Sequence, residues 1–143
     1  MTRALESVSF LGFQPRERLN DLYNAADLHL VTLRDEISGL LVPSKYAAAL
    51  AAGKPVLVVG GAGTDLHREI VDRQLGWTCP HEPERIVEAV LEAARDRAAT
   101  RRRGEAARLC FEERYARTRT ARAWTDLLDR LAGSRDHGDH PHA

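Results

Sequence analysis

Short apolar runs alternate with helix-like stretches along most of this 143-residue chain, and no other feature restricts the fold as much. Runs at 8–13, 28–33, 54–61 and 77–80 are rich in apolar, β-branched or aromatic residues. They are too short for ordinary helices, so each predicts a strand. The run at 28–33 is almost continuously apolar, which predicts a strand buried on both faces of its sheet.

Between these runs, apolar residues recur at three- and four-residue spacing, which is typical of amphipathic helices. Pro15 stands in the first turn of the first helix. Gly53 is expected to end the second helix, Thr64 or Asp65 to cap the third, and Gly76 to end the third. The sequence predicts helices at about 15–27, 44–52, 65–74, 82–96, 98–114 and 118–132.

The alternation of short strands with helices predicts right-handed crossovers and therefore a parallel sheet. We expect an α/β fold, a Rossmann-like doubly wound parallel sheet with extra C-terminal helices, over residues 1–132. The polar tail at 133–143 is expected to be disordered. Ligands of such sheets bind beyond the carboxyl ends of the strands, so the loops "GFQP", "SGLLVPSK" and "GGAGTD" should line one edge.

The charge balance limits the partners that the chain can have. It carries 21 basic and 21 acidic residues, which excludes nonspecific attraction to nucleic acid. The arginine-rich stretch at 95–108 lacks interleaved aromatic residues and predicts a solvated helix face rather than an RNA site. No apolar run approaches the roughly 18 residues that span a bilayer, and no leader is recognisable, so a cytoplasmic location is expected.

The cysteines and histidines do not predict a metal site. Cys79 and Cys110 lack metal-ligand spacing and are expected to be buried or unreactive thiols. His29 is expected to be hydrogen-bonded within a strand, and His67 to face solvent. The histidines of the polar tail predict nothing more than a solvated surface; they are His137, His140 and His142.

The stretch "SGLLVPSKYAAALAAGKPVLVVGG" at 38–61 contains no His, Cys, Asp or Glu. A glycine followed by a proline-led helix start presents unpaired backbone N–H groups and the positive end of a helix dipole. Such a start can hold a phosphate without a charged catalytic group. Lys45 opposes the dipole in the first turn. Either it faces a bound anion or it points into water.

Three stretches together resemble a known family: "VSFLGFQPRERLNDLYNAADLHLVTL", "GLLVPSKYAAALAAGKPVLVVG" and "EIVDRQLGW". They look like the C-terminal, donor-binding domain of the family-four retaining glycosyltransferases, which have the GT-B fold. Within that family they look most like the bacterial exopolysaccharide and lipopolysaccharide branch, marked by Val-Pro-Ser-Lys before an Ala-Gly-Lys/Arg-Pro turn. The resemblance covers residues 8 to about 132.

This resemblance implies a hexosyltransferase that uses a nucleoside diphosphate sugar, expected to be a UDP-sugar, without a cofactor or metal. The base and ribose would lie against Gly12, Phe13, Gln14 and Ala48. The diphosphate would lie over the next loop and helix start, at Gly39, Leu40, Pro43, Ser44 and Lys45. Backbone N–H groups near the loop would stabilise charge on the departing nucleoside diphosphate.

Two departures from the family pattern accompany the resemblance. The family's pair of glutamates, which have seven residues between them, falls here at Leu40 and Ala48. The usual carboxylate contact to the ribose is therefore absent, and no catalytic residue is assigned. The family's N-terminal acceptor-binding domain and the first strand of its C-terminal domain are also missing. We expect a fragment of a longer enzyme, inactive alone, or a subunit that meets a separate acceptor-binding chain. That missing domain could bring peripheral attachment to the inner face of the membrane.

A second class of function fits the same residues. Leu40 and Ala48 could record lost chemistry in a non-catalytic Rossmann-like module that acts as an interaction subunit. Nucleotide binding separates the two hypotheses. The last predicted helix carries Trp124, Leu127, Leu128 and Leu131 on one face, so part of that apolar face should be exposed if the N-terminal domain is missing.

Overall fold

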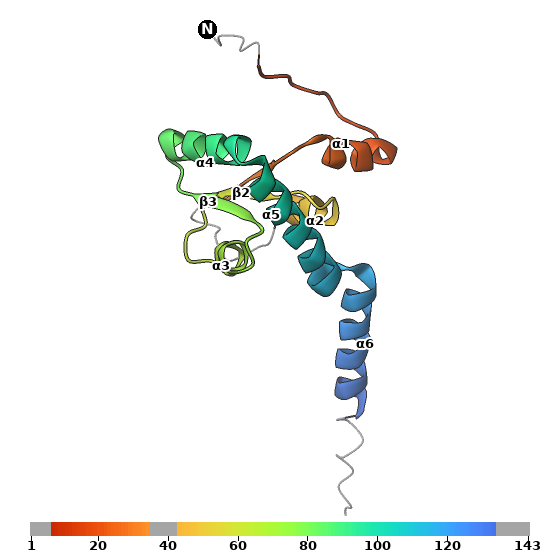
Figure 1. Ribbon diagram of the computed structural model, residues 1–143. Helices are drawn as coiled ribbons and strands as arrows, with labels where there is room; N and C mark the ends of the chain where they lie inside the picture. Colours follow the sequence, from red (N-terminus) through yellow and green to blue (C-terminus); the bar gives the residue numbers. More distant parts are fainter. Residues whose placement is uncertain (1–6, 35–42, 134–143) are drawn as a thin grey trace, which may run out of the picture.

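The computed structural model describes residues 7–34 and 43–133, and within them the chain forms a three-stranded parallel sheet with helices on both faces (Figure 1). The strands follow the sequence order β1 (His29–Thr32), β2 (Val56–Val59) and β3 (Gly76–Cys79). The helical elements are η1 (Arg16–Arg18), α1 (Leu19–Ala25), α2 (Ser44–Ala51), α3 (Asp65–Asp72), α4 (Pro83–Arg95), α5 (Arg97–Cys110), the π-helical turn η3 (Phe111–Tyr115) and α6 (Arg117–Gly133). The predicted doubly wound parallel fold is confirmed.

Strand β2 is the centre of the sheet. It pairs in parallel with β1 on one side and β3 on the other, and all four of its residues are buried. Val56 and Val58 join one core cluster, whereas Leu57 and Val59 join the other. A strand covered on both faces has no polar face, which explains its uninterrupted apolar sequence.

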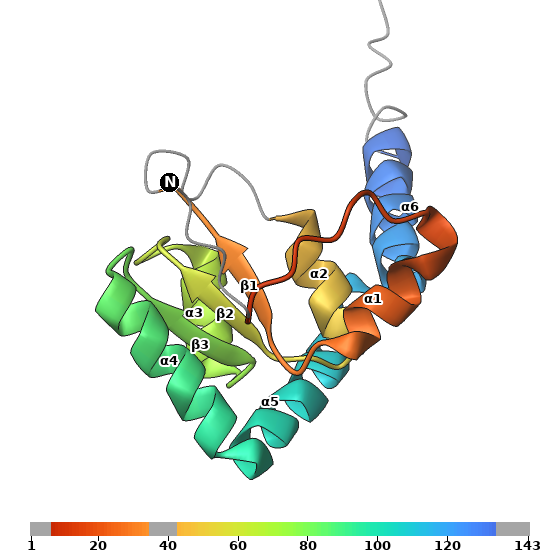
Figure 2. The ribbon, with the colours of Figure 1, turned by 90° about the horizontal axis from the view of Figure 1, so that it is seen from above.

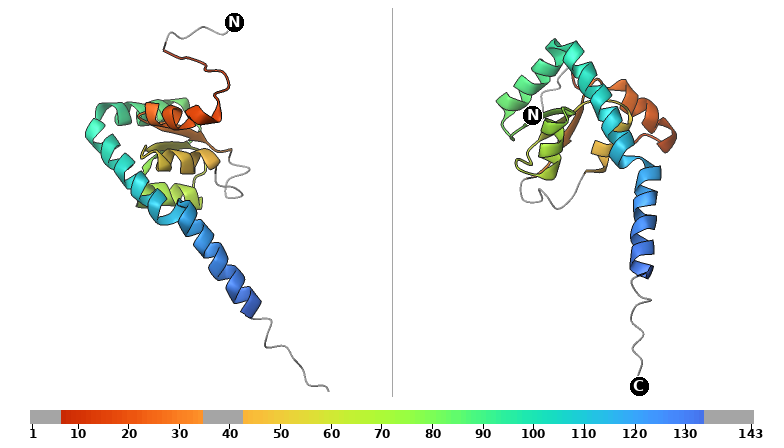
Figure 3. Two further views of the ribbon diagram at one scale, coloured as in Figure 1. Left: turned by 90° about the vertical axis from the view of Figure 1, so that its right-hand side faces the viewer. Right: turned by 60° about the horizontal axis from the view of Figure 1, so that its bottom comes forward.

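Helices cover the two faces of the sheet unequally. Helices α2 and α3 pack on one face and share a core with part of α5, while α4 packs on the other face over β2 and β3 (Figure 3, left). Helix α1 lies on the α4 side but leaves the face of β1 largely open, so that Leu30 is 56% exposed. Helix α6 projects away from the sheet (Figures 1 and 3).

Local sequence explains how these helices begin and end. Thr64 accepts a hydrogen bond from the His67 backbone N–H at the start of α3, as the cap prediction required. Asp96 accepts one from the Ala99 N–H at the start of α5. Gly53, at φ +65°, follows the end of α2 in the left-handed conformation that the sequence predicted.

The expected strand at 8–13 does not form. This segment is extended but unpaired, and Phe10 and Phe13 are 96% and 99% exposed (Figure 2). Strand propensity mainly reflects packing against neighbouring strands, and none lies beside this segment in the described part of the chain. The prediction of a strand buried on both faces at 28–33 is also wrong, because β1 is an edge strand with Val31 inward and Leu30 outward.

Gly76 does not end α3. The left-handed residue after that helix is Gln74, at φ 54°, and Gly76 is the first residue of β3. A Cβ at Gly76 would overlap the carbonyl oxygen of Val56 on the neighbouring strand. Glycine is therefore needed for close approach of two backbones rather than for a turn.

Other predictions concern the ends of the chain. Helix α6 continues to Gly133, and residues 134–143, including the three tail histidines, lie outside the described residues. Trp124 and Leu131, 60% and 58% exposed, confirm that the apolar face of α6 is open. No helix in the described ranges is both long and apolar enough to span a bilayer.

Replacing Gly76 by alanine should lower the free energy of unfolding by about 3 kcal/mol, since the new methyl group must displace backbone atoms of β2. Gly12→Ala is the matched control, because a Cβ there meets nothing within 4 Å. Urea unfolding followed by circular dichroism measures both variants. Equal midpoints for the two would contradict the close approach of β2 and β3.

Candidate functional site

Hydrogen bonds connect the carboxyl ends of the three strands at one edge of the sheet. The Leu33 N–H donates to the Val59 carbonyl at 2.9 Å, and the Gly60 N–H donates to the Cys79 carbonyl at 2.8 Å. His81, in the loop after β3, bonds the Leu33 carbonyl through Nε2 at 2.6 Å. Because a carbonyl oxygen can only accept, Nε2 must carry the hydrogen. The edge is thus closed by contacts between all three loops.

The glycine-rich loop after β2 turns sharply into α3. Gly60 has φ +83°, and a Cβ there would overlap both the Leu33 carbonyl oxygen and the His81 ring. The Thr64 hydroxyl donates to the Gly61 carbonyl at 2.7 Å. His67 is half-buried rather than solvent-facing, and its Nδ1 has no hydrogen-bond partner within the described ranges.

Helix α2 begins at the same edge, because it follows the carboxyl end of β1. Pro43 has extended backbone angles and precedes the first helical residue, and the Ser44 and Lys45 side chains are exposed. The first turn contains no acid. Its backbone N–H groups and the positive end of the helix dipole therefore face an edge without local carboxylates from α2.

Only part of the predicted site comes together. Ala48 is half-buried one turn along α2 from Ser44, whereas Gly39 and Leu40 lie outside the described residues. The predicted base-binding residues lie in the unpaired N-terminal segment, where the Gln14 side chain donates only to the Gly12 carbonyl. Phe13 is almost fully exposed. The structure therefore does not assemble a base pocket from these residues.

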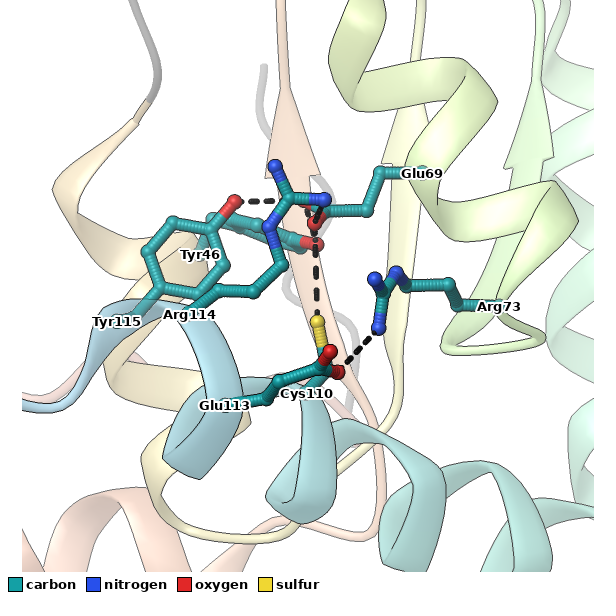
Figure 4. A network of polar contacts seen from close by, with 7 residues as sticks. All are labelled: Tyr46, Glu69, Arg73, Cys110, Glu113, Arg114 and Tyr115. Carbon is teal, nitrogen blue, oxygen red and sulfur yellow. Dashed lines mark hydrogen bonds and ion pairs between the residues drawn. The ribbon is translucent and has the colours of Figure 1, made fainter. Parts of the chain in front are cut away.

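A largely buried carboxylate that the sequence analysis did not identify projects from α3 toward α2 and η3. Glu69, whose side chain is 9% exposed, accepts hydrogen bonds from the hydroxyls of Tyr46 at 2.9 Å and Tyr115 at 2.6 Å. Arg114 pairs with its other oxygen at 3.0 Å, and the Cys110 thiol lies 3.7 Å from that oxygen. Figure 4 shows this Glu69 cluster with the neighbouring ion pair between Arg73 and Glu113.

Burial and the Glu69 charge both act on the groups around the carboxylate. They raise the pKa values of Tyr46 and Tyr115, so both phenols remain neutral hydrogen-bond donors near neutral pH. Burial also raises the pKa of Cys110 to about 11, which keeps it a thiol. Cys79 and Cys110 are free, as predicted. The sequence spacing could have identified Glu69 as an inward-facing carboxylate. It follows the buried Leu66 by three residues and therefore shares the inward face of the helix.

A large open groove lies at the opposite edge of the sheet. Its volume is about 1130 Å³, and it runs between the loops preceding β1 and β2 and the helices α4 and α5. Leu28, Pro55 and Val90 contribute apolar walls, and Lys54 and Arg101 lie among its polar lining residues. This is the amino edge, away from the loops that bind ligands in parallel sheets. No cluster of three potential metal ligands occurs in the ranges that the structure describes.

Comparisons with known proteins agree with this architecture. A family model described as "Glycosyl transferases group 1" matches residues 1–96. A probable glycosyltransferase, WbjE of Pseudomonas aeruginosa, is 39% identical over 71 residues, which cover 50% of this chain and 18% of that protein. The chain therefore matches less than a fifth of its relative's length. No solved structure matches.

Glu69→Ala should destabilise the fold by about 3 kcal/mol, since it leaves two inward-facing hydroxyls and a guanidinium without their shared acceptor. Glu113→Ala, which removes an exposed partner of Arg73, should have little effect. Thermal and urea unfolding of both variants would check this. A similar loss for the two would show that the Glu69 cluster adds nothing beyond a surface ion pair.

Proposed function

The chain belongs to the group 1 glycosyl transferases, and on that premise we propose that it is a donor-binding domain for a nucleoside diphosphate sugar. The observation that carries the proposal is the start of α2, where Ser44 and Lys45 are exposed in an acid-free first turn at the carboxyl edge. The donor is a UDP-sugar, and the product is a cell-surface polysaccharide or glycolipid. The relative from Pseudomonas aeruginosa, described as a probable glycosyltransferase, supports transfer in general.

The first turn of α2 supplies three kinds of contact to the diphosphate. Backbone N–H groups donate hydrogen bonds along the helix axis, the Ser44 hydroxyl donates another, and Lys45 contributes a full positive charge. An anion also removes the repulsion between Lys45 and the helix dipole. During transfer, negative charge grows on the departing nucleoside diphosphate, and these fixed donors stabilise it.

The ribose lacks the carboxylate contact usual in this family, because Ala48 stands at the corresponding position. Ala48 is half-buried on α2 and can offer only a methyl surface to the sugar ring. Affinity must then come mainly from the diphosphate and the base. We expect weak discrimination between ribose and deoxyribose nucleotides as a consequence.

The carboxyl edge is favoured over the groove at the amino edge. Helices α2 and α3 begin at the carboxyl edge, as crossover helices do in a parallel sheet. The first turn of α5 lies in the groove, but Asp96 caps it by accepting from the Ala99 N–H and places a negative charge there. In the groove, Arg97 pairs with Asp27, and Arg108 pairs with Glu112 and also bonds the Ala51 carbonyl. Its size alone does not make the groove a nucleotide site.

We further propose that the domain works with an N-terminal acceptor-binding domain, in the same longer chain or as a separate subunit. Doubly wound sheets commonly have strand order 3-2-1-4-5-6, and β1-β2-β3 match its last three strands. The free edge of β1 and the exposed apolar segment at 8–13 fit sheet partners supplied by a further part of the enzyme. The N-terminal domain would also provide any peripheral attachment to the membrane.

A second candidate function rests on a different observation. The exposed apolar residues of α6 offer a binding surface that needs no nucleotide, and the family's two glutamate positions hold Leu40 and Ala48. A non-catalytic interaction subunit would show both features. Such a subunit would bind a protein partner through α6 and leave the carboxyl edge empty.

An NMR titration of the ¹⁵N-labelled chain with UDP, GDP and ADP tests the donor site. We expect saturable shifts at Ser44, Lys45 and their neighbours, strongest for UDP. Lys45→Ala should weaken binding by about tenfold because a charged phosphate contact is lost. Lys54→Ala, which removes a lysine at the opposite edge, should leave the affinity unchanged. Absence of binding at millimolar nucleotide by the folded chain would favour the interaction subunit.

The isolated chain should self-associate and show no glycosyl transfer. The apolar face of α6 is open, so contact between copies buries Trp124, Leu127 and Leu131. Leu128→Glu should shift the chain toward monomer in light scattering coupled to size-exclusion chromatography. Asp126→Glu, on the polar face of the same helix, is the control. Turnover by the pure chain would contradict its dependence on a further domain.

A further inference from the structure

Two tyrosines from different elements donate to the same oxygen of Glu69. Tyr46 belongs to the first turn of α2 and Tyr115 ends η3, and both hydroxyls bond Oε2. Tyr46 directly follows Lys45 in sequence. A change in Glu69 therefore reaches the start of α2 through a single hydrogen bond.

The start of α2 lacks the local features that usually fix a helix terminus. Pro43 at the N-cap provides no side-chain hydrogen bond, and no acid stands in the first turn. Lys45 opposes the helix dipole. With only eight residues, α2 is also too short to be stable without tertiary contacts. Something outside the helix must hold its first turn in place.

Glu69 is suited to that role because it is itself held firmly. Leu66 and Ile70, on the same face of α3, are buried in the core. Arg114 and Cys110 contact Oε1 and leave Oε2 for the two phenols. The Tyr46 ring is fully buried and meets the Tyr115 ring edge-on, with centroids 5.9 Å apart. The Tyr46 hydroxyl thus donates its hydrogen bond to a carboxylate that several neighbouring groups hold in place.

We propose that Glu69 is a positioning residue for the donor site, holding the first turn of α2, and with it Ser44 and Lys45, through the Tyr46 hydroxyl. The part of this inference that concerns nucleotide binding rests on the proposed function. Its structural part, that Glu69 orders the start of α2, does not depend on a nucleotide. The carboxylate holds the first turn of α2 through a side-chain contact from α3.

The two tyrosines provide a matched test. Tyr46→Phe and Tyr115→Phe each remove one hydroxyl from the same acceptor oxygen and keep the ring. Only the first variant cuts the connection to α2. A role limited to stability predicts similar effects of both variants at Ser44 and Lys45, whereas positioning predicts an effect confined to Tyr46→Phe.

Backbone ¹⁵N relaxation of the free chain gives the first readout. In Tyr46→Phe, the order parameters of Ser44 and Lys45 should fall relative to that of Leu50 farther along α2, while Tyr115→Phe should keep the wild-type values. Glu69→Gln retains an acceptor oxygen without the charge, so its order parameters at Ser44 and Lys45 should lie between those of the two phenylalanine variants. It replaces Tyr46→Phe in the test if that variant does not fold. Equal order at Ser44 and Lys45 in both phenylalanine variants would overturn the proposal.

Nucleotide titration gives the second readout. The dissociation constant for UDP should rise about fivefold in Tyr46→Phe and by less than about twofold in Tyr115→Phe. Equal weakening in both variants would refute a positioning role in binding. A wild-type chain that binds no nucleotide would remove the proposed function, and the relaxation data would still decide whether Glu69 orders α2.

Discussion

Complete burial of β2 is the constraint on which the rest of the structure depends. A strand with four buried residues and partners on both sides must have apolar cover above and below. Val56 and Val58 receive it from α2, α3 and α5, while Leu57 and Val59 receive it from α4. The parallel direction forces crossovers that place the start of α2 at the carboxyl edge. The candidate donor site is therefore a consequence of how this one strand is buried.

Both outer strands are edges of the described sheet, but β3 is more buried than β1. Near β3, Gly76 permits close backbone approach, and His81 ties the loop ends across to Leu33. Beyond β1, Leu30 and the apolar segment at 8–13 remain exposed, as does the apolar face of α6. Among the described residues, the start of α2 forms part of the proposed diphosphate site, whereas Phe13 and its neighbours form no base pocket.

Sequence pattern predicted most of the fold because its signals are local. The apolar run of β2, the Thr64 cap and the glycine after α2 each act within a few residues. Predictions failed where residues distant in sequence determine the local structure. The 8–13 segment lacks an adjacent strand, and Gly76 allows close contact with Val56 rather than ending a helix. Glu69 was missed because its phenol partners lie 23 and 46 residues away. The start of α2 was predicted, but the contact that holds it was not.

A crystal structure of the chain with a bound nucleoside diphosphate would test the central claim most directly. The account predicts the diphosphate against the first turn of α2, within hydrogen-bonding distance of backbone N–H groups there and of Lys45. A diphosphate bound instead in the groove between α4 and α5, beside Lys54 and Arg101, would contradict it.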